Sequence, residues 1–470
     1  MDFTPRAIIK KAEFWIVVLF LVRLVGITAP PLEGSHNWRQ CTDLMVARNL
    51  YEGNGDLLHP VVDDTGATEG VIGMEFPLLS GLHALTAQVF GYTHWYGRLI
   101  NLLISSLGLW FFAKILRFFK LNEKIVLAST LFLGVSIWFC FSRKFTADTF
   151  CISLIFIALY CGLKFLEGKN LGWLIAYALT STIAVLSKIP AMLYLALLLP
   201  AVLNPAWPRR KRAWTAAATL LPVAAAVWWY FVWNPHLATT YGNWYNQGLS
   251  VREGLLDCLR HPLQILDNFY FDAFCGYLLF IASLIGFILL IIRKKRKEIL
   301  IFLLLLTAFV AFIIKSGYHF YDQSYYMIPF VPVMALLAGY AVSNISKNWI
   351  FIFLILDCCI ESIGNQQHDF FIKEKEKYKM EIAEVMKAHT GDGLVMINGK
   401  GNPQLLYLAH RKGWSCTKEE IENEEFMAGK IAEGCRYLVV DLHEWPDFSM
   451  GGWEVWRDEN FVISAFPANI

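Results

Sequence analysis

The sequence predicts a polytopic α-helical membrane protein with a small α/β domain at its C-terminal end. Hydrophobic residues make up 56% of the 470 residues, and the mean hydropathy is +0.45. A soluble protein has roughly 45–50% apolar residues. Long apolar runs recur between residues 12 and 363, and after residue 364 short apolar runs alternate with helical segments.

The apolar runs define about eleven candidate transmembrane helices, because a helix needs roughly 17–25 mostly apolar residues to cross a bilayer. The candidate spans are residues 12–29, 97–117, 124–141, 146–166, 171–187, 189–204, 213–233, 272–292, 299–315, 326–343 and 349–363. Residues 1–363 are therefore expected to form a transmembrane domain. Its first outer loop covers about residues 30–96.

The lysine and arginine residues of the short loops predict the orientation, because cytoplasmic loops carry an excess of them. With a cytoplasmic N-terminus, the cytoplasmic side holds Arg6, Lys10, Lys11, Arg117, Lys120, Lys124, Lys164, Lys169, Lys347 and residues 209–212 and 293–297. The outer short loops hold only Arg143, Lys144, Lys188 and Lys315. We therefore expect a multi-pass protein of the cell (inner) membrane with an extracytoplasmic C-terminal domain. Membrane lipids are expected partners and nucleic acids are not.

Residues 364–470 predict the separate domain. The runs at 393–398, 437–441 and 461–466 are typical of buried strands. Helices are expected over residues 378–389, 403–411 and 419–434. This alternation predicts an α/β domain of about 100 residues.

The first outer loop is too polar to cross a bilayer and is rich in side chains that can perform chemistry. A helix over residues 35–51, capped by Ser35, would place His36, Arg39 or Gln40, and Asp43 along one face. Its opposite face is apolar, which suits a helix lying on a membrane surface. The polar face then either lines an active-site cavity or is simply solvated, and the periodicity does not separate these alternatives.

Glu75 is a second acidic residue of interest in this loop. It lies between Met74 and Phe76, and a carboxylate among apolar neighbours at a membrane surface is costly without a partner. It is either a solvated loop residue or an active-site carboxylate close to Arg39 or Arg98.

Several motifs extend this pattern. They are His36-x-Trp38-Arg39-Gln40, Asp43, Ala47-Arg48-Asn49, Pro60, Gly66, Glu75-Phe76-Pro77, Gly91, Gly97-Arg98, Ser142-Arg143, Asp148, Ser187-Lys188-x-Pro190, His319 and Tyr325-Tyr326-x-Ile328-Pro329-x-Val331-Pro332. Together they cover roughly residues 10–345. This set resembles a bacterial branch of the GT-C fold glycosyltransferases, a superfamily that includes protein O-mannosyltransferases and the aminoarabinose transferase of lipid A.

The resemblance implies an integral membrane glycosyltransferase. It would move a sugar from a polyprenyl-phosphate-linked donor to an acceptor hydroxyl of a glycan, lipid or protein on the outer face, with inversion. The family carries its essential acid in the first outer loop, usually in an Asp-Glu doublet that this chain lacks. Glu33 is nearest that place, Asp43 follows, and Glu75 matches the family's second acidic position. We predict Asp43 as the general base, with Glu75 as the next candidate.

The remaining candidate residues would bind substrate. The lipid phosphate that leaves in the reaction must be stabilised by positive charge. The predicted outer side holds Arg39, Arg98, Arg143 and Lys188. His36, Gln40, His319 and Tyr325 could hydrogen-bond sugar or phosphate. No cofactor is predicted and no metal-ligand cluster has a recognisable spacing, although carboxylates can bind a divalent cation.

Two other functions compete with this prediction. A transporter or flippase of lipid-linked sugars would place charges within its spans and show repeated halves. Here the spans are poor in charge and no internal repeat is visible. In the third alternative, the C-terminal domain is a sensor or scaffold and the membrane part is its anchor.

Overall fold

The computed structural model describes residues 11–33, 36–53, 55–243 and 248–467. Contacts divide the chain into two compact units. The membrane unit consists of Met1–Ile27, Gly97–Phe231 and Gln247–Phe370, and the head unit of Thr28–Tyr96, Val232–Asn246 and Phe371–Ile470. The first outer loop and the C-terminal segment therefore belong to the same unit.

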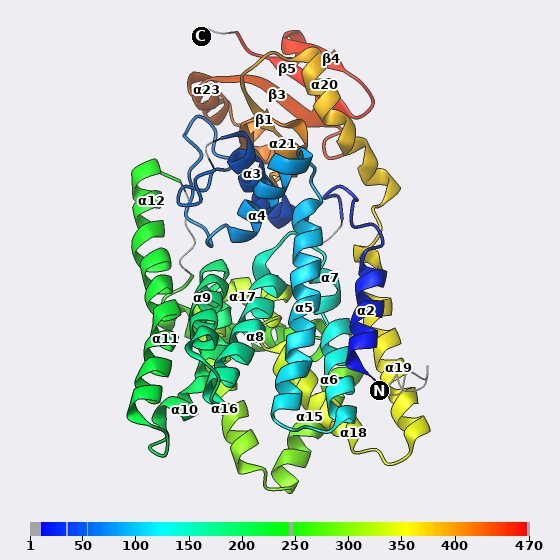
Figure 1. Ribbon diagram of the computed structural model, residues 1–470. Helices are drawn as coiled ribbons and strands as arrows, with labels where there is room; N and C mark the ends of the chain where they lie inside the picture. Colours follow the sequence, from blue (N-terminus) through cyan, green and yellow to red (C-terminus); the bar gives the residue numbers. More distant parts are fainter. Residues whose placement is uncertain (1–10, 34–35, 54, 244–247, 468–470) are drawn as a thin grey trace. The chain divides into compact units, whose positions relative to one another are not determined.

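The membrane unit is almost entirely helical (Figure 1). Its α-helices are α2 (Ala12–Arg23), α5 (Tyr96–Phe118), α6 (Glu123–Val135), α7 (Trp138–Phe141), α8 (Ala147–Leu166), α9 (Leu171–Ser187), α10 (Leu199–Leu203), α11 (Arg209–Trp228), α13 (Val251–Arg260), α14 (Pro262–Asp267), α15 (Leu278–Ile292), α16 (Arg296–Ser316), α17 (Tyr318–Asp322), α18 (Val331–Ser343) and α19 (Asn348–Asn365). Segments of 3₁₀ or π-helix are η1 (Ile189–Leu198), η2 (Trp229–Trp233), η3 (Asn268–Asp272), η4 (Ser324–Met327) and η5 (Gln367–Asp369).

A helix lies within each segment that the sequence predicts as a span. Within the described residues, five helices are long and apolar enough to cross a membrane: Tyr96–Phe118, Ala147–Leu166, Arg209–Tyr241, Arg296–Ser316 and Asn348–Asn365. Four more of the predicted spans are apolar but shorter: Leu171–Ser187, Ile189–Leu203, Leu278–Ile292 and Val331–Ser343. The helical membrane fold is confirmed, whereas the number of spans stays a prediction.

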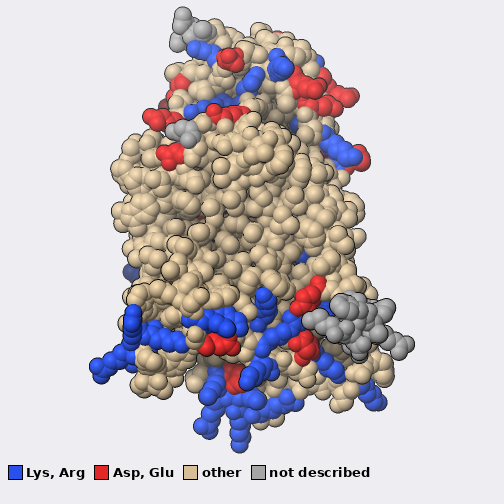
Figure 2. Space-filling model, viewed as in Figure 1, with Lys and Arg blue, Asp and Glu red and all other residues tan. Residues whose placement is uncertain are grey.

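Positive charge gathers at one end of the membrane unit. The turns between α5 and α6, α10 and α11, α15 and α16, and α18 and α19 lie at that end (Figure 1). Exposed cations of these turns include Lys120, Arg209, Arg210, Lys347 and residues 293–297. Figure 2 shows this band of Lys and Arg side chains beside a broad uncharged face, the pattern expected of a lipid-facing surface with cytoplasmic cations at its edge. Arg6 and Lys10, expected on the same side, lie outside the described residues.

The head unit contains a five-stranded sheet with helices packed around it. Its helices are α3 (Asn37–Glu52), α4 (Leu78–Phe90), α12 (Asn234–Tyr241), η6 (Glu374–Glu381), α20 (Ile382–His389), α21 (Gln404–Ala409), α22 (Lys418–Glu422), α23 (Glu424–Ala432) and η7 (Gly451–Trp453). Its strands are β1 (Leu394–Ile397), β2 (Gly413–Ser415), β3 (Cys435–Asp441), β4 (Glu454–Arg457) and β5 (Phe461–Ala465).

The strand order is β2-β1-β3-β5-β4. Strands β2, β1 and β3 are parallel, and β5 and β4 add an antiparallel edge. All three strand segments expected from the sequence are strands, and their apolar side chains, such as Met396, Leu438 and Val462, form the core. The expected helix over 419–434 is instead two helices, because the Asn423 side chain accepts from the backbone N–H groups of Glu425 and Phe426 and caps a new start.

The first outer loop covers the open edge of this sheet at β2. The Gly413 N–H donates to the Asp63 carbonyl (2.9 Å), and the Gly66 N–H donates to the Gly413 carbonyl (2.7 Å). Gly66 has a φ of +60°, and a Cβ there would lie 2.1 Å from the Trp414 ring. Only glycine fits this approach, which leaves the edge strand without an open row of backbone groups at that point.

Candidate active site

Helix α3 places Arg39 and Asp43 one turn apart, and the loop before α4 brings Glu75 to them. Arg39 Nη2 lies 2.6 Å from Glu75 Oε2 and 3.6 Å from Asp43 Oδ1. The Ser80 hydroxyl of α4 donates to the Asp43 carbonyl (3.1 Å) and ties the two helices together. One guanidinium thus links the two candidate acids, and of the two alternatives for Glu75 the structure has the one with an arginine neighbour.

Glu33 and Gln40 form a second polar contact beside this group. Gln40 Nε2 donates to Glu33 Oε2 (3.3 Å), and both residues are buried. His36 stands at the N-terminus of α3 in the left-handed region (φ 58°). The expected Ser35 cap lies outside the described residues.

The expectation that α3 lies on a membrane surface is wrong, and of the two alternatives for its polar face the solvated one is excluded. Every residue from Gln40 to Arg48 is buried, on the polar and the apolar side alike. The helix packs against α4 and against α21 of the C-terminal segment. Both faces therefore have protein neighbours, and the amphipathic pattern reports two different packing surfaces rather than solvent and lipid.

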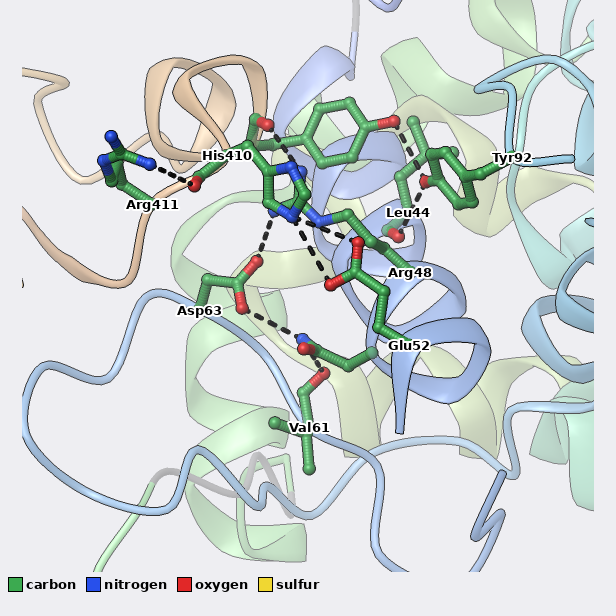
Figure 3. Close-up of polar contacts among 10 residues, drawn as sticks. Leu44, Arg48, Glu52, Val61, Asp63, Tyr92, His410 and Arg411 are labelled. Atoms are coloured by element: carbon green, nitrogen blue, oxygen red, sulfur yellow. Dashed lines mark hydrogen bonds and ion pairs between the residues drawn. The ribbon is translucent and has the colours of Figure 1, made fainter. Parts of the chain in front are cut away.

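Arg48 is the main link between α3 and the C-terminal segment (Figure 3). Its Nη2 donates to Asp63 Oδ2 (2.6 Å) and its Nη1 donates to the Tyr407 carbonyl (2.9 Å). The guanidinium also lies 4.9 Å from the centre of the Tyr407 ring. Asn49 Nδ2 donates to Asp63 Oδ1 (3.0 Å), so Asp63 is held by two neighbours on one helix.

Further contacts surround this link in Figure 3. The Tyr92 hydroxyl donates to the Leu44 carbonyl (3.3 Å) and lies 3.1 Å from the Tyr407 hydroxyl. At the exposed C-terminal end of α3, a Glu52 carboxylate oxygen lies 3.1 Å from His410 Nε2. Sequence reasoning gave no role to Arg48 or Asn49, although both stand in the Ala47-Arg48-Asn49 motif.

Asp64, the neighbour of Asp63, has a different environment. Its Oδ1 accepts from the Ser415 N–H at the end of β2 (2.8 Å), and within the described residues it forms no ion pair. Burial raises the pKa of this carboxyl to about 6, helped by the charge of Asp63, while the Ser415 N–H acts in the opposite direction.

The membrane unit holds the other predicted cations. Lys188 Nζ lies 2.6 Å from Asp148 Oδ1 and 4.7 Å from the centre of the Tyr325 ring. Asp148 lies in α8, Lys188 at the junction of α9 with η1, and Tyr325 in η4. The structure thus brings together Lys188 and Tyr325, two of the predicted substrate-binding residues.

Arg143 has a different setting from Lys188. Its guanidinium donates to the backbone carbonyls of Arg23, Val25 and Asp369. The neighbouring Lys144 pairs with the Asp369 side chain (3.2 Å). These contacts fasten the end of α2 and the segment after α19.

Arg98 and His319 complete the predicted set. Arg98 is buried near the start of α5. His319 lies in α17 with its ring 4.0 Å from that of Tyr318. Burial lowers the pKa of His319, while Asp322 acts in the opposite direction, so the imidazole is neutral at pH 7. Within the described residues, no group of three or more His, Cys, Asp or Glu side chains is arranged to hold a metal.

Comparisons with known proteins extend the sequence resemblance. Residues 76–230 match the family model described as dolichyl-phosphate-mannose-protein mannosyltransferase. Among curated protein sequences, none matches the chain significantly.

The fold matches solved structures over nearly the whole chain. ArnT from Cupriavidus metallidurans in the apo state has a TM-score of 0.58 and 15% identity, covering 96% of this chain and 97% of that one. The same protein bound to undecaprenyl phosphate gives 0.57 and 15%, covering 97% and 98%. The Archaeoglobus fulgidus oligosaccharyltransferase, tethered with an acceptor peptide, gives 0.54 and 11%, covering 92% and 69%.

Proposed function

We propose that this chain is a GT-C fold glycosyltransferase that moves a sugar from a polyprenyl-phosphate donor to an acceptor hydroxyl, with inversion. The observation that carries this proposal is the linked group of Arg39, Asp43 and Glu75. The structure of ArnT bound to undecaprenyl phosphate supports the donor class. The charge pattern of the membrane unit supports an inner-membrane enzyme with a cytoplasmic N-terminus and an extracytoplasmic head unit.

Asp43 is the proposed general base. It takes the proton of the acceptor hydroxyl while that oxygen attacks the anomeric carbon and the bond to the lipid phosphate breaks. Glu75 makes the shorter contact with Arg39 (2.6 Å against 3.6 Å). Its carboxylate is therefore committed to holding the guanidinium, which in turn orients Asp43. Glu33, the other acid near this position, accepts from Gln40.

Lys188 is the proposed contact for the lipid phosphate in the membrane unit. It forms a side-chain pair with Asp148, and a phosphate can compete for such a lysine because an ammonium carries three donors. Arg143 is a weaker candidate, since its donors are directed at backbone carbonyls.

The test is sugar transfer from a radiolabelled polyprenyl-phosphate sugar by the purified full-length protein. Asp43→Asn should lower kcat by about 10²- to 10⁴-fold, the usual contribution of a general base. Glu75→Gln should cause a smaller loss, and Lys188→Gln should raise KM for the donor. Glu69→Gln, an exposed acid of the same loop, is the matched control and should keep full activity.

Two outcomes would contradict the proposal. Full activity in both Asp43→Asn and Glu75→Gln would remove these acids from the chemistry. Movement of the labelled lipid across a vesicle membrane without cleavage of the sugar–phosphate bond would favour a transporter instead.

A further inference from the structure

A cavity of about 320 Å³ lies within the head unit, apart from the Arg39 group. It is lined by Trp38, Thr42 and Met45 of α3, by Val62 and Asp64 of the first outer loop, and by Gly401 after β1. This volume is at the lower end of the roughly 300–1,000 Å³ found for small-ligand pockets.

The topology of the sheet places this cavity where ligands commonly bind. From β1 the chain passes through α21 to β2 on one side, and from β2 it returns through α22 and α23 to β3 on the other side. The switch point of this order lies between β1 and β3, whereas the cavity lies beyond the carboxyl ends of β1 and β2, at the same edge of the sheet where open α/β sheets bind ligands. Gly401 follows the carboxyl end of β1, and Asp64 is bonded to Ser415 at the carboxyl end of β2.

The loop after β1 is held in place by side-chain bonds. Asn398 pairs with the backbone of Asp441 at the end of β3, accepting its N–H (2.7 Å) and donating to its carbonyl (3.2 Å). Asn402 donates to the Asn37 side chain (3.1 Å), and the Ser415 hydroxyl donates to the Asn402 carbonyl (2.9 Å). The cavity is thus preformed, which lowers the ordering cost of binding.

The lining excludes some ligand classes and favours another. Among the described residues that line the cavity, only Asp64 carries a charged side chain. Its carboxylate would repel an anionic group such as a lipid phosphate, and no cation in this lining would compensate. Trp38 keeps 38% of its surface exposed, and Met45 and Val62 add apolar surface. A sugar ring has an apolar C–H face that suits an indole and hydroxyls that suit a carboxylate.

The same helix carries both the cavity lining and the candidate base. Trp38, Thr42 and Met45 follow one another at i, i+4 and i+7 and share one stripe of α3. Arg39 and Asp43 are each one position further and occupy the adjacent stripe. A molecule in the cavity therefore contacts the same helix that carries Asp43, on a face about 100° around its axis.

We propose that this cavity binds a neutral sugar unit of the acceptor, with Trp38 against the ring face and Asp64 accepting a hydroxyl. That the bound sugar belongs to the acceptor rests on the proposed function. Binding of a sugar in this cavity does not itself require catalysis. The enzyme would then take an acceptor that already carries a sugar, whether a free glycan, a glycolipid or a glycoprotein.

The experiment measures binding of the full-length protein in detergent to an immobilised panel of neutral and anionic oligosaccharides. We expect binding to a subset of the neutral oligosaccharides. Trp38→Ala and Asp64→Asn should each weaken it by about tenfold or more, whereas Trp38→Phe should restore most of it. Glu69→Gln is the matched control and should bind like the wild type. The midpoint of thermal unfolding, measured for each variant, separates lost binding from lost folding.

Further outcomes separate the two proposals. Asp43→Asn should lower the rate of transfer by about 10²- to 10⁴-fold and keep oligosaccharide binding. If transfer is absent in the wild type but binding still depends on Trp38 and Asp64, the proposed function fails and the sugar site stands. No binding to any neutral oligosaccharide, preference for the anionic ones, or binding unchanged by Trp38→Ala and Asp64→Asn in folded protein would overturn the sugar site.

Discussion

Two adjacent aspartates of the first outer loop have opposite electrostatic settings. Asp63 is paired with Arg48 at 2.6 Å and accepts from Asn49. Asp64 accepts one backbone N–H and stands beside the charge of Asp63, and burial raises its pKa to about 6. An ionised Asp64 therefore costs folding free energy, which suits a residue that serves a ligand rather than stability.

This setting predicts how stability depends on pH. The pKa of Asp64 is higher in the folded protein, about 6, than its ordinary value of 3.8. The folded state thus binds more protons between these values, so the contribution of Asp64 to stability is greatest below about pH 4 and is lost as pH rises through 6. Asp64→Asn should therefore raise the stability at pH 7 by about 2 to 3 kcal/mol.

The measurement is thermal unfolding of wild type and Asp64→Asn between pH 4 and 8. The two proteins should converge at pH 4 and separate as pH rises. Asp447→Asn, an exposed acid of the C-terminal segment, is the control and should follow the wild type. A constant difference between wild type and Asp64→Asn at every pH would contradict the raised pKa.

At the scale of elements, helix α3 shows what its sequence can and cannot predict. Spacing alone places Arg39 and Asp43 one turn apart, and the structure has them so. Spacing cannot predict that Glu75 returns to the same guanidinium, since this depends on the path of the loop between α3 and α4. Nor does it reveal that α21 covers α3, because the contact joins segments more than 340 residues apart, as between Arg48 and Tyr407.

The pairing of the first outer loop with β2 gives a prediction at this scale. Gly66→Ala would place a Cβ 2.1 Å from the Trp414 ring at a φ of +60°. The loop must then leave the edge of the sheet, and we expect a loss of about 2 to 4 kcal/mol of stability. Gly429→Ala in α23 is the control, since nothing lies within 4 Å of its Cβ position and alanine is the better helix former.

Thermal unfolding of both variants, with limited proteolysis of residues 60–72, checks this expectation. The Gly66→Ala variant should unfold at lower temperature and be cut sooner in that segment. Equal stability of Gly66→Ala and wild type would show that the loop does not depend on this close approach.

At the scale of the whole molecule, the sequence predicts the secondary structure better than the grouping of its parts. Hydropathy locates the membrane helices because lipid imposes one length and one polarity on them. Short apolar runs locate β1, β3 and β5 because buried strands need them. The sequence divides the chain at residue 363, whereas contacts place residues 28–96 with the C-terminal segment. That grouping rests on specific contacts such as Gly413 with Asp63 and Arg48 with Tyr407, which no periodicity encodes.

This grouping makes the C-terminal segment a structural support of the candidate active site. Deleting residues 371–470 would remove α21 from α3 and β2 from the first outer loop, so sugar transfer should be lost and that loop should become sensitive to protease. A deletion can also lower activity by unfolding the rest of the protein. Arg48→Met therefore tests the contact between α3 and the C-terminal segment with that segment still present. It leaves the Asp63 carboxylate buried without its cation, a change that costs about 3–5 kcal/mol.

Arg457→Met is the control for Arg48→Met, because the Arg457 pair with Glu454 is exposed and is worth at most about 1 kcal/mol. We expect Arg48→Met to lower the unfolding temperature and reduce transfer, and Arg457→Met to do neither. Full transfer and a protease-resistant loop in the deletion variant would show instead that the domain is an accessory, as a sensor or scaffold would be. That result would mean that residues 1–370 are sufficient for catalysis, because α3 would then hold Arg39 and Asp43 in place without α21.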